Sequence, residues 1–145
     1  MKIFVPNKFI PYGRQTISSK DVQAVAKALR SEYLTTGPRV RQFEEKLAAY
    51  CGARYAVVCS SGTAALHLSC LALGLKEKDS IVTSPITFLA TANCARYVGA
   101  EVAFTDIDER TGNLDPGKLS QRLRRTRNVK AIFPVHFAGN PAEME

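Results

Sequence analysis

The sequence has little of what a membrane-spanning, secreted or metal-binding protein needs. No apolar run among its 145 residues approaches the roughly 18 residues that cross a bilayer. The opening segment, "MKIFVPNKFIPYGRQ", has neither a long apolar stretch nor a small-residue cleavage site, which predicts no secretion signal. The four cysteines form no C-x-x-C pair. We therefore expect a cytoplasmic protein with free thiols and no membrane partner.

A metal site is the alternative for two of these side chains. His67 and Cys70 are three residues apart on an expected helix, which would place two ligands on one face. No third or fourth ligand follows at a spacing typical of zinc. The cysteines lie in or beside apolar stretches, where buried thiols act as small apolar residues. We predict no metal centre.

Acidic residues are also few, because 13 Asp and Glu face 20 Lys and Arg, for a net charge of +7. Much of the excess lies in "KLSQRLRRTRNVK", at one helix end, where cations complement the helix dipole. No RNA-binding signature or helix-turn-helix pattern accompanies the charge, so we expect no nucleic-acid partner. A basic surface also suits an anionic small molecule.

The chain beyond residue 52 alternates between expected strands and helices. A capping box at Ser18 and Asp21 begins an earlier helix, Pro38 begins the next, and Gly52 ends it. Short apolar strands are then expected at 55–59, 80–83, 102–105 and 131–135, with helices at 63–73, 88–98 and 119–125 and a last helix beginning after Asn140. This order predicts an α/β fold with a mainly parallel sheet and helices on both faces.

The stretch "SSGT" connects the first expected strand to its helix. Such a turn points free backbone N–H groups and a positive dipole end at the space above the strand ends, where phosphate commonly binds. Gly62 would let a ligand approach closely, while Ser61 and Thr63 would add hydroxyl groups. No G-x-x-x-x-G-K or G-x-G-x-x-G motif is present. A plain capped helix start is the alternative.

An aromatic residue follows the next strand. Phe88, in "TSPITFLATANCARY", is expected at the same edge of the sheet as the "SSGT" turn. A phosphate site beside an aromatic platform is what a phosphorylated heteroaromatic cofactor requires. Packing of Phe88 in the core is the alternative.

Several longer segments resemble one family. "LTTGPRVRQFEEKLAAYCGARYAVVCSSGTAALHLSCLALGL", "DSIVTSPITFLATANCARYVGA", "DIDERTGNLDP" and "AIFPVHFAGNPAEM" are similar to the sugar aminotransferases of the DegT/DnrJ/EryC1/StrS family. These are pyridoxal-phosphate enzymes of fold type I. The likeness runs from about residue 9 to the last residue. "FIPYGRQTIS" and "SPITFLATAN" most resemble the branch that aminates a UDP-linked 4-keto-6-deoxy sugar in pseudaminic acid synthesis.

The resemblance implies roles for particular residues and partners. Ser61, Gly62, Thr63 and Ala64 match the turn that binds the phosphate of pyridoxal phosphate, and Phe88 matches the aromatic residue that stacks on its ring. The positions near the nucleotide sugar are Tyr12, Glu32, Tyr33, Leu34 and Thr35. His136 either lines the site or is a buried histidine satisfied by backbone. A UDP-linked keto-sugar, an amino-acid donor and a second copy of the chain are the implied partners.

Two catalytic positions of the family have no match. None of the lysines matches the lysine that forms the Schiff base, and neither Asp106 nor Asp108 matches the carboxylate that holds the pyridine nitrogen. We therefore expect an extended segment at 1–17 and, at 18–145, the amino-terminal part of the large domain, truncated and inactive alone. A non-catalytic module that binds a phosphorylated ligand, or a structural remnant, is the alternative.

Overall fold

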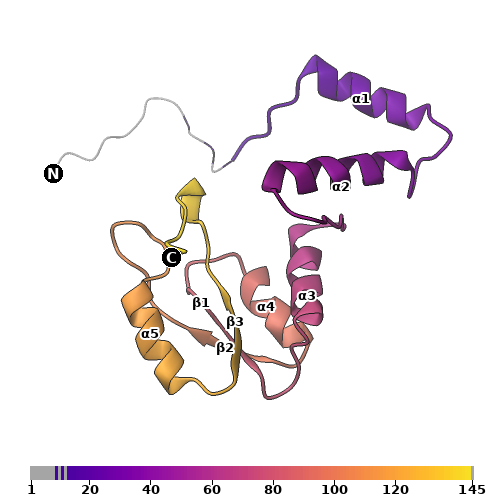
Figure 1. Cartoon of the computed structure of the whole chain (residues 1–145). Helices are drawn as coiled ribbons and strands as arrows, with labels where there is room; N and C mark the ends of the chain where they lie inside the picture. Colours follow the sequence, from indigo (N-terminus) through magenta and orange to yellow (C-terminus); the bar gives the residue numbers. More distant parts are fainter. Residues whose placement is uncertain (1–8, 10, 12, 145) are drawn as a thin grey trace. The chain divides into compact units, whose positions relative to one another are not determined.

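A computed structural model describes residues 9, 11 and 13–144. Contacts divide the chain into two units, one ending at Val58 and the other beginning at Cys59 (Figure 1). The elements in chain order are α1 (Ser19–Leu29), α2 (Pro38–Cys51), α3 (Gly62–Ala72), β1 (Ser80–Thr83), α4 (Ala90–Tyr97), β2 (Glu101–Phe104), α5 (Pro116–Arg125), β3 (Val129–Phe133) and the 3-10 turn η1 (Phe137–Gly139). None of the described helices has the length and apolar character needed to cross a bilayer.

Both helices of the first unit begin where their capping residues predict, and α2 also ends there, whereas α1 ends at Leu29, before the expected end near Tyr33. The Asp21 amide donates to Ser18 Oγ at 3.4 Å, and the Ser18 amide donates to the Asp21 carboxylate at 2.7 Å, which forms the capping box of α1. Pro38 is at the first position of α2, where its missing N–H costs nothing. Gly52 ends α2 with a φ of 64°, a conformation that favours glycine.

The apolar stripe of α2 lies open within this unit. Val40, Phe43 and Leu47 are spaced to share one helix face, yet each is more than a third exposed. Neither α1 nor α2 has a buried residue. The described part of the first unit therefore has no core of its own around these helices.

The second unit is built on a parallel sheet in the order β2-β1-β3. The central strand, β1, is buried along its whole length. Ile81 stands opposite Val102 on one side and Ala131 on the other, so these side chains point to the same face. The predicted parallel α/β arrangement is confirmed.

Helices cover both faces of this sheet (Figure 1). On one face, Ile81 packs in a buried cluster that includes Cys70 of α3 and Cys94 of α4. On the opposite face, Ile132 of β3 and Leu119 of α5 line a common cleft. Ile132 pairs with Val82, the residue after Ile81. Neighbouring residues of one strand point to opposite faces, so Ile81 and Ile132 meet different helices.

The cysteines divide between core and surface. Cys70 and Cys94 are fully buried, as predicted. Burial, and then a hydrogen bond with Cys94, raises the pKa of the Cys70 thiol to about 12, so it stays protonated and unreactive. The prediction is wrong for Cys51, which is exposed on the last turn of α2, and Cys59 is half-buried.

Residues 55–59 do not form the predicted strand. Tyr55 and Val57 are 74% and 79% exposed, and the amide of Val58 donates to the Glu44 side chain at 3.0 Å rather than to another strand. A strand exists through hydrogen bonds to a neighbour. No described strand pairs with this segment, so its apolar pattern alone does not produce one.

The predicted last helix is also absent from the described residues, because those that follow Asn140 are not helical. The amide of Ala142 donates to His136 Nδ1 at 2.9 Å. The carbonyl oxygens of Asn140 and Pro141 accept hydrogen bonds from Asn113. These backbone amide and carbonyl groups are therefore hydrogen-bonded to the side chains of His136 and Asn113 rather than to one another in a helix.

Candidate functional site

The first turn of α3 presents two backbone amides to solvent. Ser61 is the N-cap, and its Oγ accepts a hydrogen bond from the Ala64 amide at 3.2 Å. The carbonyl oxygen of Ser61 accepts from the Ala65 amide at 3.0 Å. Within the part of the chain that the structure describes, no hydrogen bond occupies the amides of Gly62 and Thr63. Both N–H groups therefore remain available to an anion at the positive end of the helix dipole.

The space above this turn is open. A Cβ built on Gly62 would meet no atom within 4 Å, and its φ is not in the left-handed region. Glycine is therefore not required by the fold at this position. Thr63 is half-buried and adds a hydroxyl group to the two amides. This donor set, at a helix start, fits a phosphate group.

An exposed aromatic ring follows β1. Phe88 is 76% exposed in the turn between β1 and α4. Its carbonyl oxygen accepts the Thr91 amide at 3.0 Å, and Thr87 Oγ1 donates to Thr91 Oγ1 at 2.8 Å, so the turn is internally bonded. The first turns of α3 and α4 lie toward the same end of the sheet in Figure 1. The alternative for Phe88, packing in the core, is wrong, and its ring is free to contact a ligand.

His136 follows β3 at the carboxyl end of the sheet. It is exposed rather than buried, and its Nδ1 accepts the Ala142 amide at 2.9 Å. The sequence left open whether His136 lines the site or is a buried histidine bonded to backbone. The burial is wrong, although the backbone contact is present. The exposed His136 side chain lies beyond the carboxyl end of β3.

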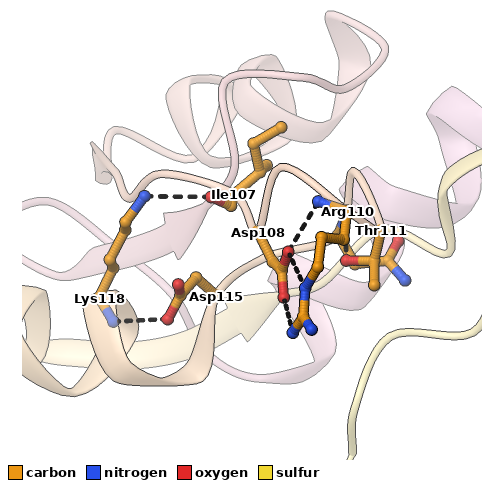
Figure 2. A network of polar contacts seen from close by, with 7 residues as sticks. Ile107, Asp108, Arg110, Thr111, Asp115 and Lys118 are labelled. Atoms are coloured by element: carbon orange, nitrogen blue, oxygen red, sulfur yellow. Dashed lines mark hydrogen bonds and ion pairs between the residues drawn. The ribbon is translucent and has the colours of Figure 1, made fainter.

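The loop after β2 is held by two cationic side chains, shown in Figure 2. Asp108 accepts from the Arg110 amide at 2.8 Å and from Arg110 Nη2 at 3.2 Å. The Arg110 side chain, and then its amide, lowers the pKa of Asp108. Lys118 Nζ donates to the carbonyl oxygen of Ile107 at 3.2 Å, and its amide donates to Asp115 at 2.9 Å.

Asp106, like Asp108, accepts hydrogen bonds from a backbone amide and from a cationic side chain. It accepts the Ile107 amide at 2.9 Å and Lys118 Nζ at 3.1 Å. The Ile107 amide, followed by the Lys118 side chain, lowers the pKa of Asp106. Asp106 and Asp108 thus serve the loop as ionised partners of nearby cations.

Sequence reasoning missed Asn113, which is 4% exposed. Its side chain bonds to three backbone groups of the segment after β3. An asparagine in "TGNLD" is typical of an exposed turn, and nothing in the local pattern indicates its burial.

The expected sugar-binding positions lie in the turn between α1 and α2. Tyr33 and Leu34 are 60% and 70% exposed, and Glu32 and Thr35 are exposed beside them. A Cβ on Gly37 would lie 2.8 Å from Tyr33 Cβ, so glycine lets this turn close tightly. Tyr12 lies outside the described residues. These positions belong to the first unit, whereas the α3 turn and Phe88 belong to the second.

His67 and Cys70 have contacts other than a metal ion. The His67 ring meets the edge of Tyr97 at 5.5 Å between centroids, and Cys70 lies in the core beside Cys94. Among residues 9, 11 and 13–144, no three potential ligands gather.

Comparisons with known proteins agree on one family. Its model, the DegT/DnrJ/EryC1/StrS aminotransferase family, matches residues 15–145. The chain is 44% identical over 96% of its length to the spore coat polysaccharide biosynthesis protein SpsC of Bacillus subtilis. It is 46% identical over 94% of its length to the UDP-4-amino-4,6-dideoxy-N-acetyl-beta-L-altrosamine transaminase of Campylobacter jejuni. It covers 35% and 36% of these two proteins, about a third of the length of the curated relatives.

A solved structure of NtdA from Bacillus subtilis, with bound cofactor PMP, is also similar. The TM-score is 0.80 at 34% sequence identity, over 88% of this chain and 30% of that one. The fold of the described residues is therefore that of the corresponding part of a pyridoxal-phosphate enzyme of fold type I.

Proposed function

Because the chain belongs to the DegT/DnrJ/EryC1/StrS aminotransferase family, we propose that residues 18–145 are the amino-terminal part of the large domain of a sugar aminotransferase. The whole protein would transfer an amino group from an amino acid to a nucleotide-linked 4-keto-6-deoxy sugar. The chain itself would supply the half of the site that holds the phosphate and the ring of pyridoxal phosphate. The relative from Campylobacter jejuni supports a UDP-linked sugar as the substrate.

One observation carries this proposal, the pair of free amides at the start of α3. The amides of Gly62 and Thr63 would donate to the phosphate, with the Thr63 hydroxyl beside them. Ser61 and Ala64 hold the turn through their own hydrogen bond. Because the donors belong to a helix start, they need no rearrangement to receive an anion.

Phe88 would supply the second contact. Its exposed ring gives a flat surface for stacking of the pyridine ring. Pyridoxal phosphate, when bound, supplies an electron-withdrawing ring that stabilises negative charge on the substrate carbon during amino-group transfer. The stacking residue would fix the plane of that ring and exclude water from one face.

The turn between α1 and α2 would contact the nucleotide sugar. Glu32, Tyr33, Leu34 and Thr35 are exposed there, and Tyr12 is proposed for the same role. We propose that the site is completed in a homo-oligomer, because the open apolar stripe of α2 is consistent with a covering partner. A titration with UDP-N-acetylglucosamine tests this contact. Tyr33→Ala is expected to weaken binding, while Tyr50→Ala, at another exposed tyrosine of the same unit, is expected to leave it unchanged.

Replacement of Gly62 by proline tests the phosphate contact most directly. Proline removes one of the two free N–H groups, and the first helical position tolerates it, as Pro38 and Pro116 show at the starts of α2 and α5. Ser61 is already extended, which is the conformation that the residue before proline prefers. We expect a folded variant that lacks only this donor.

The assay compares pyridoxal phosphate with pyridoxal, its counterpart without phosphate, by isothermal titration calorimetry. Loss of a hydrogen bond to a charged group, worth about 1.5–3 kcal/mol, corresponds to about 10- to 150-fold weaker binding of pyridoxal phosphate. Gly62→Ala, which keeps the N–H, shows whether the ligand needs the open space. Phe88→Ala is expected to weaken binding of both ligands, with its exposed neighbour Leu89→Ala as control. Equal affinity for the two ligands, or full binding by Gly62→Pro, would contradict the proposal.

A further inference from the structure

Asn113 clamps the backbone that follows β3. Its Nδ2 donates to the carbonyl oxygens of Asn140 at 3.0 Å and Pro141 at 2.9 Å. Its Oδ1 accepts the amide of Phe137 at 2.9 Å. The side chain therefore uses both donors and its acceptor on a segment that is 24 to 28 residues away in sequence. A buried amide with all its groups bonded fixes a unique geometry.

The clamped segment has a conformation that it would not hold alone. Ala138 has a φ of 51° and Gly139 a φ of 81°, both in the left-handed region. For alanine this region is unfavourable, and such residues persist when the surroundings hold them in place. The three bonds of Asn113 are on both sides of these residues, at 137 and at 140–141. The hydrogen bonds of Asn113 therefore maintain the unfavourable backbone conformation of Ala138.

The clamp determines the protonation pattern of His136. The Ala142 amide donates to His136 Nδ1 at 2.9 Å, and an amide N–H can only donate. Nδ1 is thus the unprotonated nitrogen, and the proton of the neutral ring is on Nε2. Ala142 comes directly after the two residues that Asn113 holds, and it is 6% exposed. The contact that selects the tautomer is therefore placed by Asn113.

We propose that Asn113 is a positioning residue that presents the Nε2–H of His136 as a hydrogen-bond donor. The His136 Nε2–H would donate to an oxygen atom of the anionic ligand bound at the carboxyl ends of β1 and β3. His136 is exposed and lies three residues after the end of β3, at the end of the sheet where Phe88 follows β1. The identity of this ligand rests on the proposed function, whereas the positioning of the His136 ring by Asn113 does not.

Nuclear magnetic resonance on the whole chain tests the positioning without any ligand. The sequence has only two histidines, so His67→Gln assigns the ring signals of His136. We expect a single neutral tautomer with the proton on Nε2 and a coupling across the hydrogen bond between the Ala142 nitrogen and His136 Nδ1. Absence of this coupling in the unmodified chain, together with a protonated Nδ1, would overturn the proposal.

The decisive variant is Asn113→Asp. The carboxylate keeps the acceptor for Phe137 but turns an oxygen toward the carbonyl oxygens of Asn140 and Pro141. We expect the folded variant to lose the coupling and to show mixed tautomers at His136. Asn128→Asp is the control, because the Asn128 side chain also donates to the backbone. Its one acceptor is the carbonyl oxygen of Lys78 at 3.1 Å. An Asn113→Asp variant that keeps the coupling would refute the role.

Addition of pyridoxal phosphate tests the ligand contact. In the unmodified chain we expect the Gly62 amide and the His136 Nε2 signals to shift together, and in Asn113→Asp only the Gly62 amide. A shift at Gly62 with none at His136 would overturn the ligand contact. If neither signal shifts, the proposed function fails, and the coupling measured without ligand still decides whether Asn113 positions the ring.

Discussion

Replacement of Gly112 by alanine tests whether the loop after β2 and the segment after β3 are packed against each other. Gly112 has a φ of +73°, and a residue with a Cβ in the left-handed region costs roughly 1–2 kcal/mol. The new Cβ would also lie 2.7 Å from Phe137 Cδ1 and 3.3 Å from Cε1. Two separate penalties are therefore expected from one methyl group.

The second penalty arises because the ring cannot simply withdraw. The backbone of Phe137 is anchored, since its amide donates to Asn113 Oδ1 at 2.9 Å. The ring must turn or the loop must shift, and overpacking of this kind costs about 1–3 kcal/mol. The sum for Gly112→Ala is about 2–5 kcal/mol, a large part of the 5–15 kcal/mol by which a typical domain is stable.

Two other glycines separate the penalties. Gly74 has a φ of +65° with no atom within 4 Å of an added Cβ, and Gly99 has a φ of +78° with its nearest atom at 3.7 Å. Their alanine variants are expected to lose only about 1–2 kcal/mol. Urea unfolding followed by circular dichroism measures all three, provided that the slopes agree. The reasoning is refuted if Gly112→Ala is no less stable than Gly74→Ala, or if Phe137→Ala fails to remove the excess.

Three further predictions concern the core, the charges and the helix cap. Ile81→Ala, in the fully buried centre of the sheet, should lower the free energy of unfolding by about 2–5 kcal/mol; a loss equal to that of the partly exposed Ile86→Ala would contradict this. Burial raises the pKa of Asp79, but hydrogen bonds from the Lys130 side chain and the Lys76 amide, together with the charges of both lysines, outweigh it, so the pKa is lowered from 3.8. Stability from this carboxylate is therefore present above pH 3.8 and lost as the pH falls through the lower folded value; urea unfolding between pH 6 and more acid values should show this loss, and Asp79→Asn should show less pH dependence. Ser61→Ala should cost about 1 kcal/mol through loss of the cap; no change in urea unfolding would show that Ser61 does not cap α3.

The alternation of strands and helices could be predicted because each element has a local signal. Ser18 and Asp21 mark a helix start, as does Asp115 before Pro116, and the structure confirms both caps. The apolar run that becomes β1 is short and continuous, which is typical of a strand buried on both faces. These features depend on neighbours in sequence, so the sequence is sufficient to find them.

The errors concern features that depend on distant partners. The pattern of residues 55–59 is that of a strand, but pairing requires a second strand, and the described residues provide none. The segment after Asn140 has a helix start signal, but Asn113 and His136 bond to its backbone instead. The burial of Asn113 depends on these same contacts. Local composition contains no information about them.

The order of strands in the sheet differs from their order of synthesis. β1 is made first and lies in the centre, with β2 and β3 added on either side. Thr83 Oγ1 donates to the carbonyl oxygen of Phe133, 50 residues later, so the last strand closes a long loop when it pairs. Contacts of such separation slow folding, and until β3 pairs, one edge of the fully buried strand β1 is open to other chains. Among the described strands, the interval before β3 is translated is therefore the one in which a chaperone that covers this edge of β1 would protect the chain most.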